Sequence, residues 1–235
     1  MTLLETRGLA RHFGGLEAVK SVDFDLPEGE HRALIGPNGA GKTTFVEMIC
    51  GRIAPSAGRV FLDGADITAL PAHRRIRRGI AYTFQITSVF AQLPVRENVA
   101  LAARRRLKGQ ALEAAVQAAL RQVGLAGTGD ELAGTLSHGH QRLLEIAMGL
   151  VQRPRLLILD EPTQGLSDGE IDHFKRLVRG LKGEITILLI EHNMNVVMEL
   201  AERVTVLESG AILAEGTPDQ IHRNPAVQAA YLGTG

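Results

Sequence analysis

The sequence lacks several features that would place it in a special class of protein. It has one cysteine, Cys50, no tryptophan and only 4% aromatic residues among its 235 residues. A single cysteine excludes an internal disulfide and a cysteine-rich zinc site, and it fits a reducing compartment. The apolar runs, such as ITILLI before Glu191, are much shorter than the ~20 residues that cross a bilayer. The first residues have no long apolar stretch or small-residue cleavage site, so no signal peptide is expected.

An excess of charge of one sign is also missing. The 26 Lys and Arg residues offset the 26 Asp and Glu residues, so the formal net charge is zero. No net field holds a polyanion non-specifically, and we therefore expect no nucleic-acid partner. The hydrophobic content of 45% and the charged content of 22% are ordinary for a globular chain. The length fits one large domain or two modest ones.

The order of strand and helix patterns predicts an α/β fold. Alternating residues favour an antiparallel pair over residues 3–9 and 19–26. Short apolar strands over 156–159, 186–190 and 204–207 are separated by helical stretches. That alternation is typical of a parallel sheet.

The segment from Pro94 to Val151 has a different composition. It is rich in Ala, Leu and Arg, with helical periodicity and no strand-like run. We therefore expect one domain with an α/β core over residues 1–87 and 152–235. A helical subdomain over residues 88–151 is inserted in this core.

A phosphate-binding loop is predicted between Gly36 and Thr43. GPNGAGKT matches G-x-x-x-x-G-K-[ST], follows the strand HRALI and opens a helix. Backbone N–H groups and the helix N-terminus favour phosphate, Lys42 is expected to reach the β- and γ-phosphates, and the Thr43 hydroxyl can ligate Mg²⁺. The pattern predicts a P-loop NTPase core. The expected nucleotide-binding residues are Gly36, Pro37, Asn38, Gly39, Ala40, Gly41, Lys42, Thr43 and Thr44.

Two acids, Asp160 and Glu161, follow the apolar strand LLIL, where packing gives no reason for charge. We expect Asp160 to hold Mg²⁺ through water and Glu161 to orient or deprotonate the water that attacks the γ-phosphate. The alternative is a plain helix N-cap or a solvated turn. The phosphate loop favours the catalytic interpretation.

Polar residues follow two other strands. His192 comes two residues after ITILLI, and in a parallel sheet this is the edge where Gly36 and Asp160 lie, so His192 is predicted to reach the γ-phosphate. Taken alone, a histidine at a strand end is more often structural. Gln85 follows the strand GIAYTF and would by itself be a turn residue.

The segment LSHGHQ, residues 136–141, begins a helix. Ser137 is a good N-cap and Gly139 permits close backbone approach, so a second helix N-terminus is available to an anion. An ordinary capped helix is the alternative.

In this order, the motifs resemble the ATP-binding subunit of the ABC transporter family, over essentially the whole chain. The resemblance implies ATP and Mg²⁺ as ligands and two copies that sandwich two nucleotides. It makes Glu161 the catalytic base, with His192 and Gln85 as further catalytic residues and Gln85 also touching Mg²⁺ and the membrane partner. Ser137 and Gly139 then contact the γ-phosphate bound by the other copy.

The same resemblance places Phe13 against adenine and the loop Gly165–Asp168 against the opposite site. The sequence departs from the family signature LSGGQ at His138 and His140. The Ser and the second Gly are retained, so nucleotide sandwiching is expected to survive. Two histidines near a phosphate make pH-sensitive activity below pH 7 a hypothesis.

Within the family, the tail EGTPDQIHRNPAVQAAYLG resembles the ATPases of branched-chain amino acid importers and their urea- and amide-importing relatives. This implies transmembrane permease subunits, a second identical or similar ATPase, an indirect solute-binding protein, and a peripheral position on the cytoplasmic face of the membrane. The alternatives are a lipopolysaccharide-extracting ATPase and a soluble ABC ATPase. The coiled coil of DNA-end members and the fused units of translation members are both missing from these 235 residues.

Two basic clusters, His73–Gly79 and Arg104–Arg106, are not explained by these motifs. A solvated helix face is the favoured interpretation. The alternative is contact with anionic lipid head groups or with acidic loops of a membrane partner.

Overall fold

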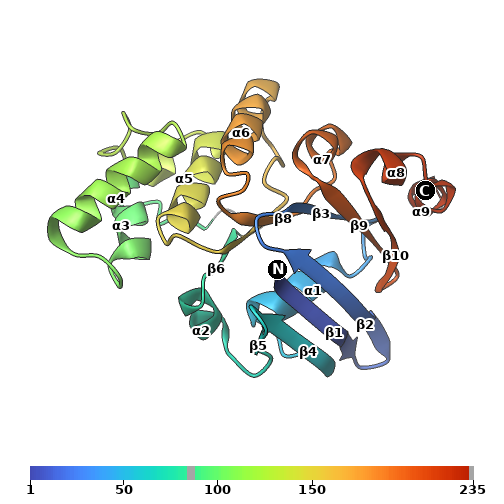
Figure 1. Cartoon of the computed structure of the whole chain (residues 1–235). Helices are drawn as coiled ribbons and strands as arrows, with labels where there is room; N and C mark the ends of the chain where they lie inside the picture. The colour runs from blue at the N-terminus through green and yellow to red at the C-terminus, as the bar shows by residue number, and fades with distance from the viewer. Residues whose placement is uncertain (84–87, 233–235) are drawn as a thin grey trace.

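The computed structural model describes residues 1–83 and 88–232, whose strands form a six-stranded and a four-stranded sheet (Figure 1). The order of the larger sheet is β10-β9-β3-β8-β7-β6, and that of the smaller is β2-β1-β4-β5. The larger sheet consists of β3 (His31–Ile35), β6 (Ile80–Thr83), β7 (Leu156–Asp160), β8 (Thr186–Ile190), β9 (Arg203–Glu208) and β10 (Ala211–Gly216). The smaller consists of β1 (Thr2–Phe13), β2 (Leu16–Pro27), β4 (Ala57–Leu62) and β5 (Ala65–Asp66).

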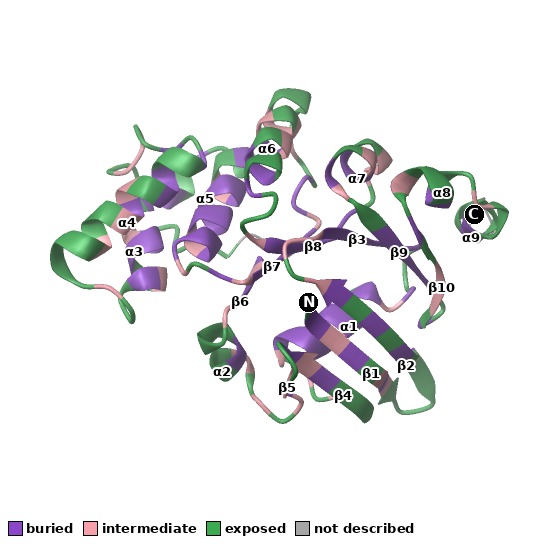
Figure 2. Ribbon diagram, in the orientation of Figure 1, coloured by how far each residue is buried: buried purple, intermediate pink, exposed green. Residues whose placement is uncertain are grey.

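The larger sheet is parallel from β6 to β9, and β10 pairs antiparallel with β9. Every residue of β3, β7 and β8 is buried (Figure 2). Parallel strands covered on both faces have continuous apolar runs instead of alternation, which explains the sequences LLIL and TILLI. The expected α/β fold with an antiparallel opening is confirmed.

The helix α1 (Lys42–Cys50) joins the two sheets. Its side chain Phe45 packs edge-to-face on Phe24 of β2, with ring centroids 5.6 Å apart. The same apolar cluster includes Leu4 of β1 and Leu188 of β8. Because α1 packs against both sheets, the loop at its N-terminus has a fixed position.

The segment between β6 and β7 contains helices and, apart from one isolated bridge in its described part, no strand. The buried side of α5 (His138–Leu150) shares one apolar cluster with Leu157 and Leu159 of β7 and with Phe174 of α6 (Asp168–Gly180). The helical segment therefore packs directly on the larger sheet; the division at residues 88 and 151 stays a prediction. Its helices are α3 (Val95–Ala103), α4 (Gly109–Gln122) and α5 (His138–Leu150).

The remaining helices cover the sheet or its edges. Figure 1 shows α8 and α9 beside β10, at the end of the larger sheet opposite α3–α5. No helix among residues 1–83 and 88–232 is both long enough and apolar enough to span a bilayer. These helices are α2 (Ala72–Arg77), α6 (Asp168–Gly180), α7 (Met194–Leu200), α8 (Pro218–His222) and α9 (Pro225–Leu232).

The basic cluster on α2 is not a uniformly solvated face. Arg74 and Arg77 are exposed, as expected, but Arg75 is only 1% exposed, so the expectation is wrong for this residue. Its guanidinium donates hydrogen bonds to the carbonyls of Met48 and Ile49 at 2.7 Å each. The last carbonyls of a helix have no partner within the helix, and five N–H donors in a planar fork satisfy several at once. Two further carbonyls, Leu70 and Thr68, accept at 2.8 Å.

Replacing Arg75 by Met should lower the free energy of unfolding by about 2–4 kcal/mol, because buried carbonyls lose their donors. Arg74→Met, on the exposed side of the same helix, should change it by less than about 0.5 kcal/mol. Urea denaturation of both variants tests this. Equal losses would show that Arg75 has no special role in holding α1 to α2.

Candidate functional site

A cavity of about 670 Å³ lies at the start of α1. Residues that follow β3, β7 and β8 are among those that line it. Parallel strands collect their carboxyl ends at one edge, where ligands of α/β proteins gather. Its lining includes these predicted site residues: Phe13, Asn38, Gly39, Ala40, Gly41, Lys42, Thr43, Thr44, Glu161 and His192. The structure thus brings together predicted residues from four separate segments of the chain.

The loop between β3 and α1 requires glycine for steric reasons. Gly41 caps α1 with a φ of 97°, in the left-handed region. A Cβ atom added there would overlap the carbonyl oxygen of Ala18, and one added at Gly36 would overlap that of Leu207. The loop therefore packs against backbone on both sides while its own N–H groups line the start of a helix, an arrangement that favours anions.

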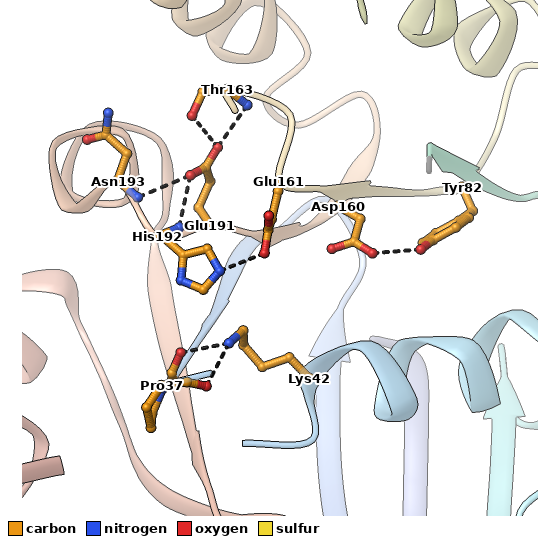
Figure 3. Close-up of polar contacts among 10 residues, drawn as sticks. Pro37, Lys42, Tyr82, Asp160, Glu161, Thr163, Glu191, His192 and Asn193 are labelled. Atoms are coloured by element: carbon orange, nitrogen blue, oxygen red, sulfur yellow. Dashed lines mark hydrogen bonds and ion pairs between the residues drawn. The ribbon is translucent and has the colours of Figure 1, made fainter. Parts of the chain in front are cut away.

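Lys42 folds back over this loop. Its Nζ atom donates hydrogen bonds to the carbonyls of Gly36 at 2.7 Å and Pro37 at 3.0 Å (Figure 3). Burial lowers the pKa of the Lys42 ammonium, and the negative charges of Glu161 and Asp160 oppose that shift. The loop thus holds a partly desolvated cation beside two carboxylates. An incoming phosphate would exchange the two carbonyl partners for charged ones.

Asp160 ends β7 and is 2% exposed. Its Oδ2 atom accepts a hydrogen bond from the Tyr82 hydroxyl at 2.6 Å. Burial raises the pKa of the Asp160 carboxyl, the Tyr82 hydrogen bond lowers it, and the neighbouring Glu161 raises it. A buried carboxylate in this position gains from a cation, which matches the role predicted for it.

The catalytic pair predicted from the sequence is in contact. Nε2 of His192 lies 2.6 Å from Oε1 of Glu161, across the cavity edge from Lys42 (Figure 3). The Glu161 backbone has a φ of 47°, and its N–H donates to the carbonyl of Ile190 at 2.9 Å. A positive φ at a residue other than glycine is strained, and the flanking hydrogen bonds hold it. The Glu161 side chain is 15% exposed, so most of it is withdrawn from solvent.

The residues predicted to bind Mg²⁺ are a hydroxyl, a carboxylate and an amide: Thr43, Asp160 and Gln85. Thr43 lines the cavity, Asp160 ends the adjacent strand, and Gln85 lies outside the described residues. Oxygen donors of this kind fit Mg²⁺, which commonly takes only one or two protein ligands beside substrate phosphates. No group of three His, Cys, Asp or Glu side chains gathers for a metal within the described part of the chain. The described oxygen donors, the Thr43 hydroxyl and the Asp160 carboxylate, are of the kind that fits a nucleotide-bound Mg²⁺.

Phe13 lies at the cavity rim, at the end of β1. Its side chain is 45% exposed, and the guanidinium of Arg11 covers the ring at 4.6 Å from the centroid. An exposed aromatic ring braced by a cation offers a flat face for stacking a base.

Ser137 and Gly139 are not among the residues that line this cavity. Ser137 caps α5, and its Oγ atom accepts from the His140 N–H at 3.2 Å, so the predicted N-cap is confirmed. On the other side, Oγ lies 3.4 Å from the Glu170 carboxylate of α6. Within one chain, the start of α5 is thus occupied by Glu170 and not by the phosphate loop.

Three residues of the site region were not predicted. Tyr82 lies on β6, and nothing in its local sequence distinguishes it from a core residue. Glu191 is an acid directly after a buried strand, the same signal that identified Asp160. Glu170 stands three residues after Ser167, a capping-box spacing that predicts only its local bonds.

Comparison with known proteins agrees with this geometry. Residues 19–164 match the family model of the ABC transporter, and residues 211–235 match that of the branched-chain amino acid ATP-binding cassette transporter. The chain is 42% identical to the high-affinity branched-chain amino acid transport ATP-binding protein BraF of Pseudomonas aeruginosa, over 98% of each chain. It is 33% identical to the lipopolysaccharide export system ATP-binding protein LptB of Haemophilus influenzae, over 99% of this chain and 98% of that one.

The fold comparison gives the same result. A crystal structure of the ADP conformation of MJ1267, an ATP-binding cassette of an ABC transporter, has a TM-score of 0.91 and 28% identity, over 99% of each chain. Three observations point to the same family. They are the family models, the relative with 42% identity over 98% of the chain, and the phosphate loop with the facing Glu161–His192 pair. The chain therefore belongs to the ABC transporter family, as an ATP-binding subunit that hydrolyses ATP.

Proposed function

We propose that this subunit powers an importer of branched-chain amino acids from the cytoplasmic face of the membrane. The observation that carries the enzymatic part is the Glu161–His192 contact at the edge of the phosphate-loop cavity. The cargo is supported by the 42% identity to BraF and by the match of residues 211–235 to the branched-chain amino acid family model.

Hydrolysis is assigned to residues at the cavity edge. Glu161 accepts a proton from the attacking water, and His192 fixes the Glu161 carboxylate through Nε2 and faces the γ-phosphate. Lys42 binds the β- and γ-phosphates, and Phe13 stacks on the adenine. Mg²⁺, when bound with the nucleotide by Thr43, Asp160 and Gln85, neutralises charge on the phosphates.

A second ATPase subunit completes the site. Ser137, which is exposed, and Gly139, which is buried, lie at the start of α5 and do not line the cavity of their own chain. We therefore assign their contacts to the γ-phosphate held by another copy or a similar subunit. The loop Gly165–Asp168, which leads into α6, is assigned to the same interface.

The permease is proposed to dock in a groove of about 340 Å³ between α2, β6 and α5. Its lining is mainly apolar, with Ile76, Tyr82 and Met148 among the side chains. Ser88, the first described residue after Gln85 in the sequence, also lines it. The exposed Arg77 and Arg105 line an adjoining hollow.

A lipopolysaccharide-extracting ATPase is the second candidate for the cargo. It is favoured by the 33% identity to LptB over nearly the whole chain. The catalytic assignments are the same for both candidates, because cargo is selected by other subunits.

The transport assignment is tested by co-purification. Tagged Glu161→Gln protein, expressed in its native cell and trapped with ATP and Mg²⁺, should recover permease subunits from detergent-solubilised membranes. The solute-binding protein of the same system should bind leucine, isoleucine or valine in calorimetry. Recovery of lipopolysaccharide-handling partners would favour the second candidate, and recovery from the soluble fraction with ribosomes or DNA would overturn the transport assignment.

Glu161→Gln should lower the steady-state rate of ATP hydrolysis by about 10²–10⁴-fold, because an amide cannot accept the water's proton. Nucleotide affinity should stay within about twofold, because the amide preserves the shape of the site. Glu113→Gln, on the exposed side of α4, is the matched control. Unchanged turnover would remove Glu161 from the role of base.

Gly139→Ala should destabilise the chain by about 1 kcal/mol, because a Cβ atom there overlaps the Glu170 carboxylate and displaces it from its capping box. In a Glu170→Ala background the same change should be neutral or stabilising, since alanine is the better helix former. Thermal unfolding of the four proteins gives the coupling. Gly169→Ala, with open space around its Cβ position, is the control. Additive effects would contradict the predicted overlap.

A further inference from the structure

Glu191 is a buried carboxylate that none of the motifs above explains. It directly follows β8 and is 3% exposed. Among the described residues it forms no ion pair with Lys or Arg. A buried charge without a countercharge is costly unless hydrogen bonds satisfy it. A specific set of hydrogen-bond donors is therefore expected around the Glu191 carboxylate.

Four donors surround the Glu191 carboxylate (Figure 3). Oε1 accepts from the Thr163 backbone N–H at 3.0 Å and from the Thr163 hydroxyl at 2.5 Å. Oε2 accepts from the backbone N–H groups of His192 at 2.9 Å and Asn193 at 3.1 Å. In each of these bonds the Glu191 carboxyl oxygen is the acceptor.

These bonds close a ring around the catalytic pair. Thr163 lies two residues after Glu161, and Glu191 immediately precedes His192. Because Nε2 of His192 contacts Glu161, the path from Glu161 through Thr163, Glu191 and His192 returns to Glu161. The ring contains the strained backbone of Glu161, whose φ is 47°. Strained conformations persist where the surrounding structure over-determines them.

The ring also reaches the loop that leads into α6. The carbonyl of Thr163 accepts the N–H of Leu166 at 3.2 Å, which begins the turn of the Gly165–Asp168 loop. A shift of this loop at the subunit interface would therefore act on Thr163, and through Glu191 on the backbone of His192.

We propose that Glu191 is a positioning residue for ATP hydrolysis. It holds the imidazole of His192 against Glu161 and connects both residues to the loop that follows Thr163. The proposal rests on the assignment of Glu161 as the base. Glu191 is absent from the residues that line the nucleotide cavity, whereas Glu161 and His192 line it. Its loss should therefore affect turnover and not nucleotide binding.

Two variants interrupt this ring of contacts, one at Glu191 and one at Thr163. Glu191→Gln keeps the size of the side chain but turns an N–H donor toward N–H donors. Thr163→Val keeps the shape and the backbone N–H but removes the hydroxyl, and Thr163→Ser returns it. Gln164→Ala, at the exposed neighbouring position, is the control on the same loop.

The full-length protein is assayed for steady-state ATP hydrolysis and, separately, for equilibrium binding of a fluorescent ATP analogue. Glu191→Gln and Thr163→Val should lower kcat by about 10–100-fold, since small misplacements of catalytic groups have effects of that size. The dissociation constant should change by less than about threefold. Thr163→Ser should return kcat to within about threefold of the parent, and Gln164→Ala should match the parent.

A spectroscopic readout does not depend on turnover. Long-range ¹H–¹⁵N spectra report the ring nitrogens of His192, with His192→Gln identifying its signals among the eight histidines. The His192 signals should move in Glu191→Gln and Thr163→Val and return in Thr163→Ser. Unmoved signals in folded variants, a loss of nucleotide affinity that parallels kcat, or failure of Thr163→Ser to restore turnover would each overturn the positioning role. Failure of the proposed function gives a different result, because Glu161→Gln would then leave turnover unchanged.

Discussion

The register of the three central parallel strands is the constraint on which the site depends. Leu34 of β3 pairs with Ile190 of β8, and Ile190 pairs with Asp160 of β7, so these residues form one row across the sheet. The phosphate loop, Glu161 and His192 each begin one or two residues beyond that row. A slip of one residue between β7 and β8 would turn the acids to the opposite face of the sheet. All three strands are buried along their whole length.

Buried charged side chains are the second feature that recurs in the structure. Lys42, Asp160 and Glu191 are all buried, and each has a polar partner at hydrogen-bond distance. Their partners differ in a way that matches their roles. Lys42 rests on backbone carbonyls that a phosphate can replace, whereas Glu191 is held by four donors from adjacent loops. The site therefore combines one exchangeable cation with a fixed anionic support. Arg75 shows the same use of a buried charge away from the site, where it joins α1 to α2.

Local patterns in the sequence predicted the components of the site. The phosphate loop is contiguous, so its composition and spacing predict its conformation directly, and the glycines at 36 and 41 pack against backbone as such a loop requires. The Ser137 cap is likewise a local property and is confirmed. Asp160, Glu161 and His192 were predicted to share one edge because parallel strands align their carboxyl ends. The prediction failed at Arg75, because a run of arginines on a helix does not show which of them faces unpaired carbonyls of another helix.

The sequence by itself determined the α/β class, the phosphate loop and the residue types available for hydrolysis, since these depend on spacing along a few contiguous residues. Only the tertiary structure decided which of them meet. Glu161 and His192 are 31 positions apart, and Tyr82 and Asp160 are 78 apart. Contacts at such separations depend on strand order and on the angles at which loops leave the sheet, and neither leaves a local signal. The ring through Glu191 and the contact between Glu170 and the start of α5 arise for that reason from the packing of the fold.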